Sequence, residues 1–119
     1  MTRNLVCLSI FAAIACSSPT AFLDVAAIPP ALHLTNPSAK PVYYFAVERV
    51  YAARIDWAPC TTPQACPSVP PHDEIVVPYQ QIAGYTAGAQ EAIVYWWHLE
   101  SMGGGGLRPD SIRAAVVRL

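Results

Sequence analysis

The sequence predicts an all-β domain, a small sandwich or barrel of short strands. Short segments rich in Val, Ile and aromatic residues alternate with turn-forming Pro and Gly, as is typical of such folds. The turn signals fall at residues 36–38, 59–71, 84–88 and 103–109. A length of 119 residues allows one small domain.

The N-terminus has the pattern of an export signal. Arg3 precedes residues 5–15, which are apolar except for Ser9. This stretch is shorter than the roughly 20 residues that span a bilayer, and it fits the apolar region of a secretory signal. We therefore expect residues 1–15 to be a cleaved signal helix; a buried N-terminal helix is the alternative.

The end of this segment, Ala13-Ile14-Ala15-Cys16, resembles a bacterial lipobox, in which Leu usually stands at the first position. The resemblance implies that Cys16 is lipidated and begins the mature chain. Ser17, in place of Asp, implies transfer to the outer membrane of a Gram-negative cell. Each buried methylene of an acyl chain contributes about 0.8 kcal/mol to anchoring. The alternative is ordinary signal cleavage with Cys16 unmodified.

The remaining cysteines, Cys60 and Cys66, are predicted to form a disulfide. Cys7 would leave with the signal and Cys16 would carry lipid, so an even pair remains in an oxidising compartment. A metal site with His72 is the competing interpretation. It is weaker, because zinc sites favour two to four residues between thiolates and need four ligands.

The exported part divides into a tether and a folded domain. Residues 16–30 are rich in Ala and Pro and read as a tether that includes a first strand, and residues 31–119 as the β-sandwich domain. Residues 32–35 alternate apolar and polar side chains, as a half-buried strand does. Residues 42–57 exceed the usual strand length, so we expect a bulge or break at residues 48–49. A short helix across residues 46–54 is the alternative.

Three further strands are expected. Residues 73–79 place Ile75 and Val77 on one face, and Pro78 requires an edge position or a strand end because it cannot donate a hydrogen bond. Residues 111–119 should pair with residues 90–100 through the Gly-rich turn. The inward faces are then predicted to carry Ile93, Tyr95, Trp97 and Leu99 on one strand and Ile112, Ala114 and Val116 on the other.

Several of these segments together resemble small bacterial lipoproteins with an immunoglobulin-like β-sandwich. The resemblance rests on Leu-His-Leu-Thr-Asn-Pro-Ser at 32–38, Pro-Val-Tyr-Tyr-Phe at 41–45, the Cys-bearing Pro-rich loop, and Ile-Val-Val-Pro at 75–78. It extends to Trp-Trp-His-Leu at 96–99 and Arg-Pro-Asp-Ser-Ile-Arg at 108–113. It covers roughly residues 30–119 and implies a fold and a location, without an activity.

Charge and motifs exclude several functions. A net charge of −1 and a single lysine, Lys40, provide no basic field for nucleic acid and no polybasic membrane patch. The chain lacks the Gly-x-Ser-x-Gly elbow of hydrolases. We expect no cofactor and no catalytic residues.

The one pattern that could hold a metal is His98 with Glu100, which share one strand face. A third ligand, His33 or His72, would have to come from elsewhere to form a zinc site for a small metal-dependent hydrolase. The alternative is a solvated face on which Glu100 pairs with Arg113.

A binding surface is predicted on the same face. If Trp97 lies in the core, its neighbour Trp96 points outward, together with Tyr44, Val94 and His98. An exposed tryptophan with apolar neighbours is typical of a contact surface. Its partner would be a glycan or another envelope protein; the alternative is that the tether segment or a loop covers Trp96.

We therefore expect a non-catalytic, lipid-anchored module of the cell envelope, in the outer membrane and facing the periplasm or the exterior. Its partners would be the membrane, through the lipid, and another envelope component. The alternatives are the metal-dependent hydrolase and an inhibitor of an envelope hydrolase. The inhibitor would insert the stapled loop of residues 60–66, whose preorganisation lowers the cost of binding.

Overall fold

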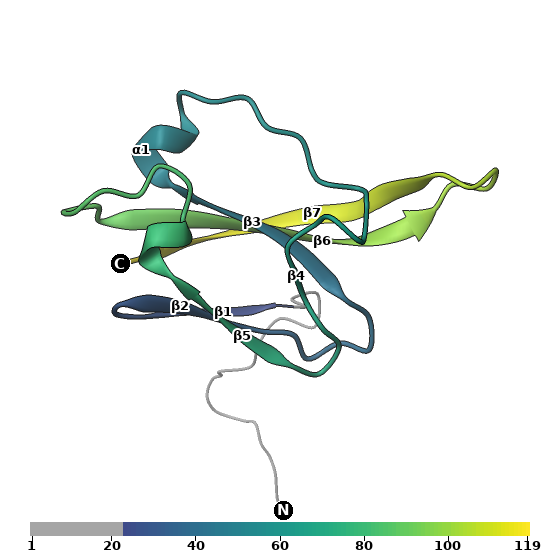
Figure 1. Ribbon diagram of the computed structural model, residues 1–119, viewed down its shortest axis with the longest axis horizontal. Helices are drawn as coiled ribbons and strands as arrows, with labels where there is room; N and C mark the ends of the chain where they lie inside the picture. The colour runs from purple at the N-terminus through teal and green to yellow at the C-terminus, as the bar shows by residue number, and fades with distance from the viewer. Residues whose placement is uncertain (1–22) are drawn as a thin grey trace, which may run out of the picture.

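The computed structural model describes residues 23–119, which form two antiparallel β-sheets that face each other across a common core (Figure 1). This confirms the all-β prediction. No helix in this part of the chain is long and apolar enough to cross a bilayer. The signal segment and Cys16 lie outside the described residues.

The first sheet has three strands in the order β1-β2-β5. They are β1 (Asp24–Ile28), β2 (Ala31–Thr35) and β5 (Glu74–Pro78). Strand β1 is the first strand that the sequence placed within residues 16–30. Strand β5 ends at Pro78 and forms a sheet edge, as its proline requires.

The second sheet has four strands in the order β4-β3-β6-β7. They are β3 (Val42–Glu48), β4 (Ser68–Val69), β6 (Glu91–Ser101) and β7 (Leu107–Arg118). The long β6–β7 hairpin through the Gly-rich turn confirms the predicted pairing. The predicted break at residues 48–49 is also confirmed, because β3 ends there and a helical turn, α1 (Arg49–Ala52), begins.

The core lies between the sheets and contradicts the predicted face assignment of β6. Trp96 is 5% exposed and packs with Val94 against residues of both sheets, whereas Tyr95, Trp97 and Leu99 lie on the opposite face. The main buried side chains of the core are those of Leu32, Leu34, Val42, Ala46, Val69, Val77, Ile82, Val94 and Trp96.

The predicted face assignment of β7 is wrong in the same way. Val116 pairs with Ile93 and shares its outer face, where Val116 is 51% exposed; Ile112 is also exposed. The side chains that reach the core here are those of Ala115 and Val117 from β7 and of Leu119, the residue after it. The prediction failed on both strands because one choice of face on β6 fixes the face of its antiparallel neighbour.

The wrong face was chosen for β6 because its outer face is also apolar and packs in a second apolar cluster. The long loop of residues 53–67 crosses this face and inserts Trp57 among three aromatic rings. The ring centroid of Trp57 lies 5.0 Å from that of Phe45, 4.6 Å from that of Tyr95 and 6.0 Å from that of Trp97.

The disulfide predicted between Cys60 and Cys66 is confirmed, with its sulfur atoms 2.04 Å apart. It lies in the same loop, and the indole N–H of Trp97 donates a hydrogen bond to the carbonyl oxygen of Cys60 at 3.1 Å. The loop is therefore held to the sheet by an aromatic insertion and a hydrogen bond, and is cross-linked within itself.

Candidate functional site

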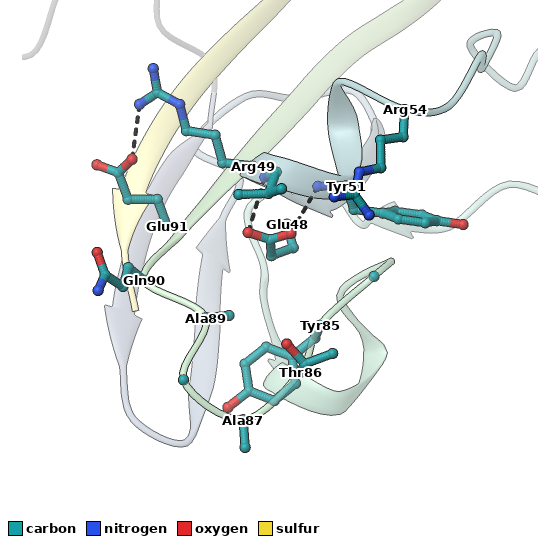
Figure 2. Close-up of a pocket in the computed structure, with 13 residues that line it drawn as sticks. Glu48, Arg49, Tyr51, Arg54, Tyr85, Thr86, Ala87, Ala89, Gln90 and Glu91 are labelled. Carbon is teal, nitrogen blue, oxygen red and sulfur yellow. Dashed lines mark hydrogen bonds and ion pairs between the residues drawn. The ribbon is translucent and has the colours of Figure 1, made fainter.

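A groove of about 700 Å³ opens at one end of the molecule, between α1 and the loop of residues 84–90 (Figure 2). It lies where β3 ends and β6 begins. Tyr51 and Arg54 are exposed on the α1 side, and Thr86 and Gln90 on the loop side. The groove thus combines an aromatic ring with several polar side chains.

Glu48 determines the shape of the α1 wall. Its carboxylate accepts hydrogen bonds from the backbone N–H groups of Val50, at 3.0 Å, and Tyr51, at 2.8 Å, and so caps the helical turn. These hydrogen bonds, and then the nearby charge of Arg54, hold the pKa of Glu48 below its usual value. Glu48 is therefore an ionised structural group.

The two walls of the groove are joined directly. The N–H of Glu48 donates to the carbonyl of Ala83 at 2.8 Å, and the N–H of Ala83 donates to the carbonyl of Ala46 at 3.0 Å. The backbone of Gly84 then lies against the side chain of Tyr51, where a Cβ atom would overlap Tyr51 Cβ, Cγ and Cδ2. With φ at +76°, position 84 favours glycine for its backbone as well.

The charges of the groove balance. Arg49 Nη1 lies 2.9 Å from Glu91 Oε1, and this ion pair spans the gap between α1 and the start of β6 (Figure 2). The other two charged residues of the lining are Arg54 and Glu48. Two cations and two anions leave the lining with no net charge.

The three histidines proposed as metal ligands do not come together. His33 Nδ1 pairs with Glu74 Oε2 at 3.0 Å on the first sheet, whereas His98 lies on β6 and His72 in the turn before β5. Across residues 23–119, no group of three or more His, Cys, Asp and Glu side chains could hold a metal ion. Within the described residues, the third ligand that a zinc site would need is therefore not brought to His98 and Glu100.

Glu100, the other proposed ligand, stands opposite Arg108 rather than Arg113, and Arg108 Nη2 lies 3.5 Å from its carboxylate. The register explains the difference. Between β6 and β7 it shifts by one residue, so that Trp97 stands opposite both Ser111 and Ile112. Ser111 has a φ of +48°, and such a bulge changes every pairing beyond it.

His98 belongs instead to a polar cluster at the end of the molecule away from the groove. Asn36 is fully buried, and its amide Nδ2 lies 2.7 Å from the carbonyl of Lys40 and 3.1 Å from those of Val69 and Pro70. Asn36 Oδ1 accepts hydrogen bonds from the N–H and the hydroxyl of Ser38, at 2.9 and 2.7 Å. Ser38 Oγ in turn lies 3.2 Å from Nε2 of His98.

A serine hydroxyl beside a histidine could act as a nucleophile with its general base. Here the hydrogen bonds of Ser38 instead hold the turn in place. A hydroxyl has one proton, and Ser38 Oγ lies within 3.0 Å of two oxygens that only accept, Asn36 Oδ1 and the carbonyl of Lys40. These two oxygens compete with His98 Nε2 for the single proton of Ser38, and a neutral His98 with its proton on Nε2 satisfies the contact by donating to Ser38 Oγ. Ser38 and His98 therefore tie the β2–β3 turn to β6.

The predicted binding surface of Tyr44, Val94, Trp96 and His98 is wrong as an exposed face. Val94 is fully buried, Trp96 is 5% and His98 8% exposed, and Tyr44 packs against the core. Burial raises the pKa of the Tyr44 hydroxyl. The exposed aromatic side chain at the groove is Tyr51, which lies in α1, within the alternative helix of residues 46–54.

Residues 23–119 thus form a small two-sheet β-protein with a polar and aromatic groove at one end. Comparison of the chain with protein-family models, with curated proteins and with solved structures finds no match. The groove, the disulfide and the lipobox-like segment are the features that bear on function.

Proposed function

We propose that this protein is an exported, lipid-anchored, non-catalytic module that binds another component of the bacterial cell envelope. The observation that carries the proposal is the groove, in which Tyr51 is 40% exposed although its base is fixed against Gly84. An exposed aromatic side chain held in one position binds a ligand with little loss of conformational entropy. The groove therefore suits binding.

The fold that we propose is an immunoglobulin-like β-sandwich. The sheet orders β1-β2-β5 and β4-β3-β6-β7 support it, because such sandwiches divide about seven antiparallel strands between two facing sheets. In this arrangement the short β4 pairs with β3 on the larger sheet. The assignment concerns architecture and implies no activity.

The envelope location and the lipid are proposed from the sequence of the first 16 residues, with support from the disulfide. Disulfides persist in oxidising compartments such as the periplasm. Metabolic labelling with an alkyne-bearing palmitate tests the anchor: the wild type should be labelled and recovered with outer membranes. Cys16→Ala should lose the label, while Cys60→Ala, which removes a different cysteine, should keep it. Absence of label from the wild type would contradict the anchor.

Binding at the groove is tested by photo-cross-linking in cells. A photoreactive amino acid at Thr86, exposed on the groove wall, should give a defined adduct. The matched control is the same amino acid at Val76, which is 56% exposed on β5 of the other sheet. Adducts from Thr86 that disappear when Tyr51→Ala is added would support the proposal. No adduct from Thr86, or equal adducts from both positions, would contradict it.

A further inference from the structure

We propose that the groove binds an uncharged saccharide segment, with the ring of Tyr51 as its stacking surface. This inference rests on the proposed binding function and names its ligand class. The reasons are the charge balance of the lining, the fixed position of Tyr51, and the kinds of polar group that line the groove.

The charge balance favours a neutral ligand. Arg49 and Glu91 form an ion pair at 2.9 Å, and the Glu48 carboxylate already accepts two backbone hydrogen bonds from α1. An anionic ligand would compete with Glu91 for Arg49 and would meet the carboxylate of Glu48, and a cationic ligand would meet Arg49 and Arg54. A neutral ligand avoids both costs, since it leaves the Arg49–Glu91 ion pair in place.

The position of Tyr51 favours a flat apolar surface on the ligand. Gly84 lies against the base of its side chain, and α1 fixes its backbone through the hydrogen bond from its N–H to Glu48. The ring is still 40% exposed. An amphipathic ring held in this way offers an apolar body and a polar hydroxyl, which match the C–H face and the hydroxyls of a pyranose.

The polar groups of the two walls can donate hydrogen bonds to ligand hydroxyls and accept hydrogen bonds from them. Arg54 supplies planar donors, Thr86 a hydroxyl, and Gln90 an amide that both donates and accepts. They belong to segments more than thirty residues apart in the chain, whose facing arrangement is seen in Figure 2. Ligand sites commonly combine apolar surface with a few polar groups of this kind.

The test uses the mature lipoprotein, extracted from membranes into a detergent without a sugar headgroup. The probes are three neutral tetrasaccharides, chitotetraose, maltotetraose and cellotetraose, and one anionic oligosaccharide, trigalacturonate. Binding is measured by titration calorimetry and by saturation-transfer difference NMR. We expect at least one neutral probe to bind more tightly than trigalacturonate and to receive saturation on the C–H face of one ring.

Two variants of Tyr51 assign the binding to the groove. Tyr51→Ala should weaken it by about tenfold, equivalent to 1.4 kcal/mol, whereas Tyr51→Phe, which keeps the ring, should retain most of it. Circular dichroism verifies that both are folded. Preference for trigalacturonate, or absence of Tyr51-dependent binding by every neutral probe, would overturn the inference. The proposed function would survive that result if Thr86 still gave Tyr51-dependent adducts with an envelope protein.

Discussion

Trp96 has the largest side chain of the core between the sheets, and its indole N–H has no hydrogen-bond partner within residues 23–119. Trp96→Ala should therefore lower the free energy of unfolding by about 3–5 kcal/mol, as removal of a large core side chain does. Urea denaturation followed by circular dichroism measures this change.

The matched variant, Trp96→Phe, should cost much less, because it keeps most of the apolar volume and removes an unpaired donor. A Trp96→Ala protein as stable as the wild type would mean that this side chain is outside the core.

His98 makes the stability of the fold depend on pH. Burial, followed by the charge of Lys40, lowers its pKa below 6.5; Arg113 adds to this effect and Asp110 partly offsets it. The folded state therefore favours neutral His98. This contribution is complete above about pH 6.5 and is lost as the pH falls toward the lower pKa of the folded state.

Unfolding free energies should accordingly fall as the pH is lowered from about 6.5 to about 5, and should fall less in His98→Gln, which keeps a polar side chain near Ser38. His33 and His72 remain in both proteins and cancel in the comparison. Identical pH profiles for the two proteins would contradict this role.

At the scale of elements, the loop of residues 53–67 is held by Trp57. Trp57→Ala should cost about 1–3 kcal/mol and should accelerate amide hydrogen exchange in the loop far more than in β2 or β3. Asp56→Ala, at an exposed neighbour, is the control and should change neither quantity. Uniform acceleration across both sheets would show that the loop is an integral part of the core.

The elements also show where sequence patterns were sufficient and where they were not. Strand β2 was predictable because only one of its faces is apolar. Strand β5 was predictable because Pro78 cannot donate a hydrogen bond and so requires a sheet edge or a strand end. On β6 both faces are apolar, so alternation alone cannot tell the core from the face covered by Trp57. The choice depends on a loop thirty to forty residues earlier in the chain.

For the whole molecule, the disulfide adds stability without determining the fold. Ring closure between Cys60 and Cys66 should contribute about 2 kcal/mol by restricting the unfolded chain. The Cys60→Ser/Cys66→Ser double variant should unfold at correspondingly lower urea while both sheets keep their circular dichroism spectrum. Loss of that spectrum in the absence of urea would contradict this assignment.

The groove, in contrast, could not be predicted from the sequence, because it depends on how distant segments pack in the whole molecule. Turn signals and apolar segments were enough to predict an all-β molecule, and the number of cysteines was enough to predict its cross-linked loop. The groove needs Tyr51 and Gly84 to meet, and that contact follows from backbone hydrogen bonds between Ala83 and the end of β3. Nothing local to either segment indicates that they are neighbours.

The course of the strands places the groove and the first described strand at opposite ends of the molecule. Strand β1 starts beside the end of β2, near the Asn36 cluster, whereas α1 follows the far end of β3 (Figure 1). A tether leading to an acylated Cys16 would thus leave from the pole opposite Tyr51. Tethered in this way, the domain would present its groove away from the lipid headgroups, toward whatever lies across the periplasm or outside the cell.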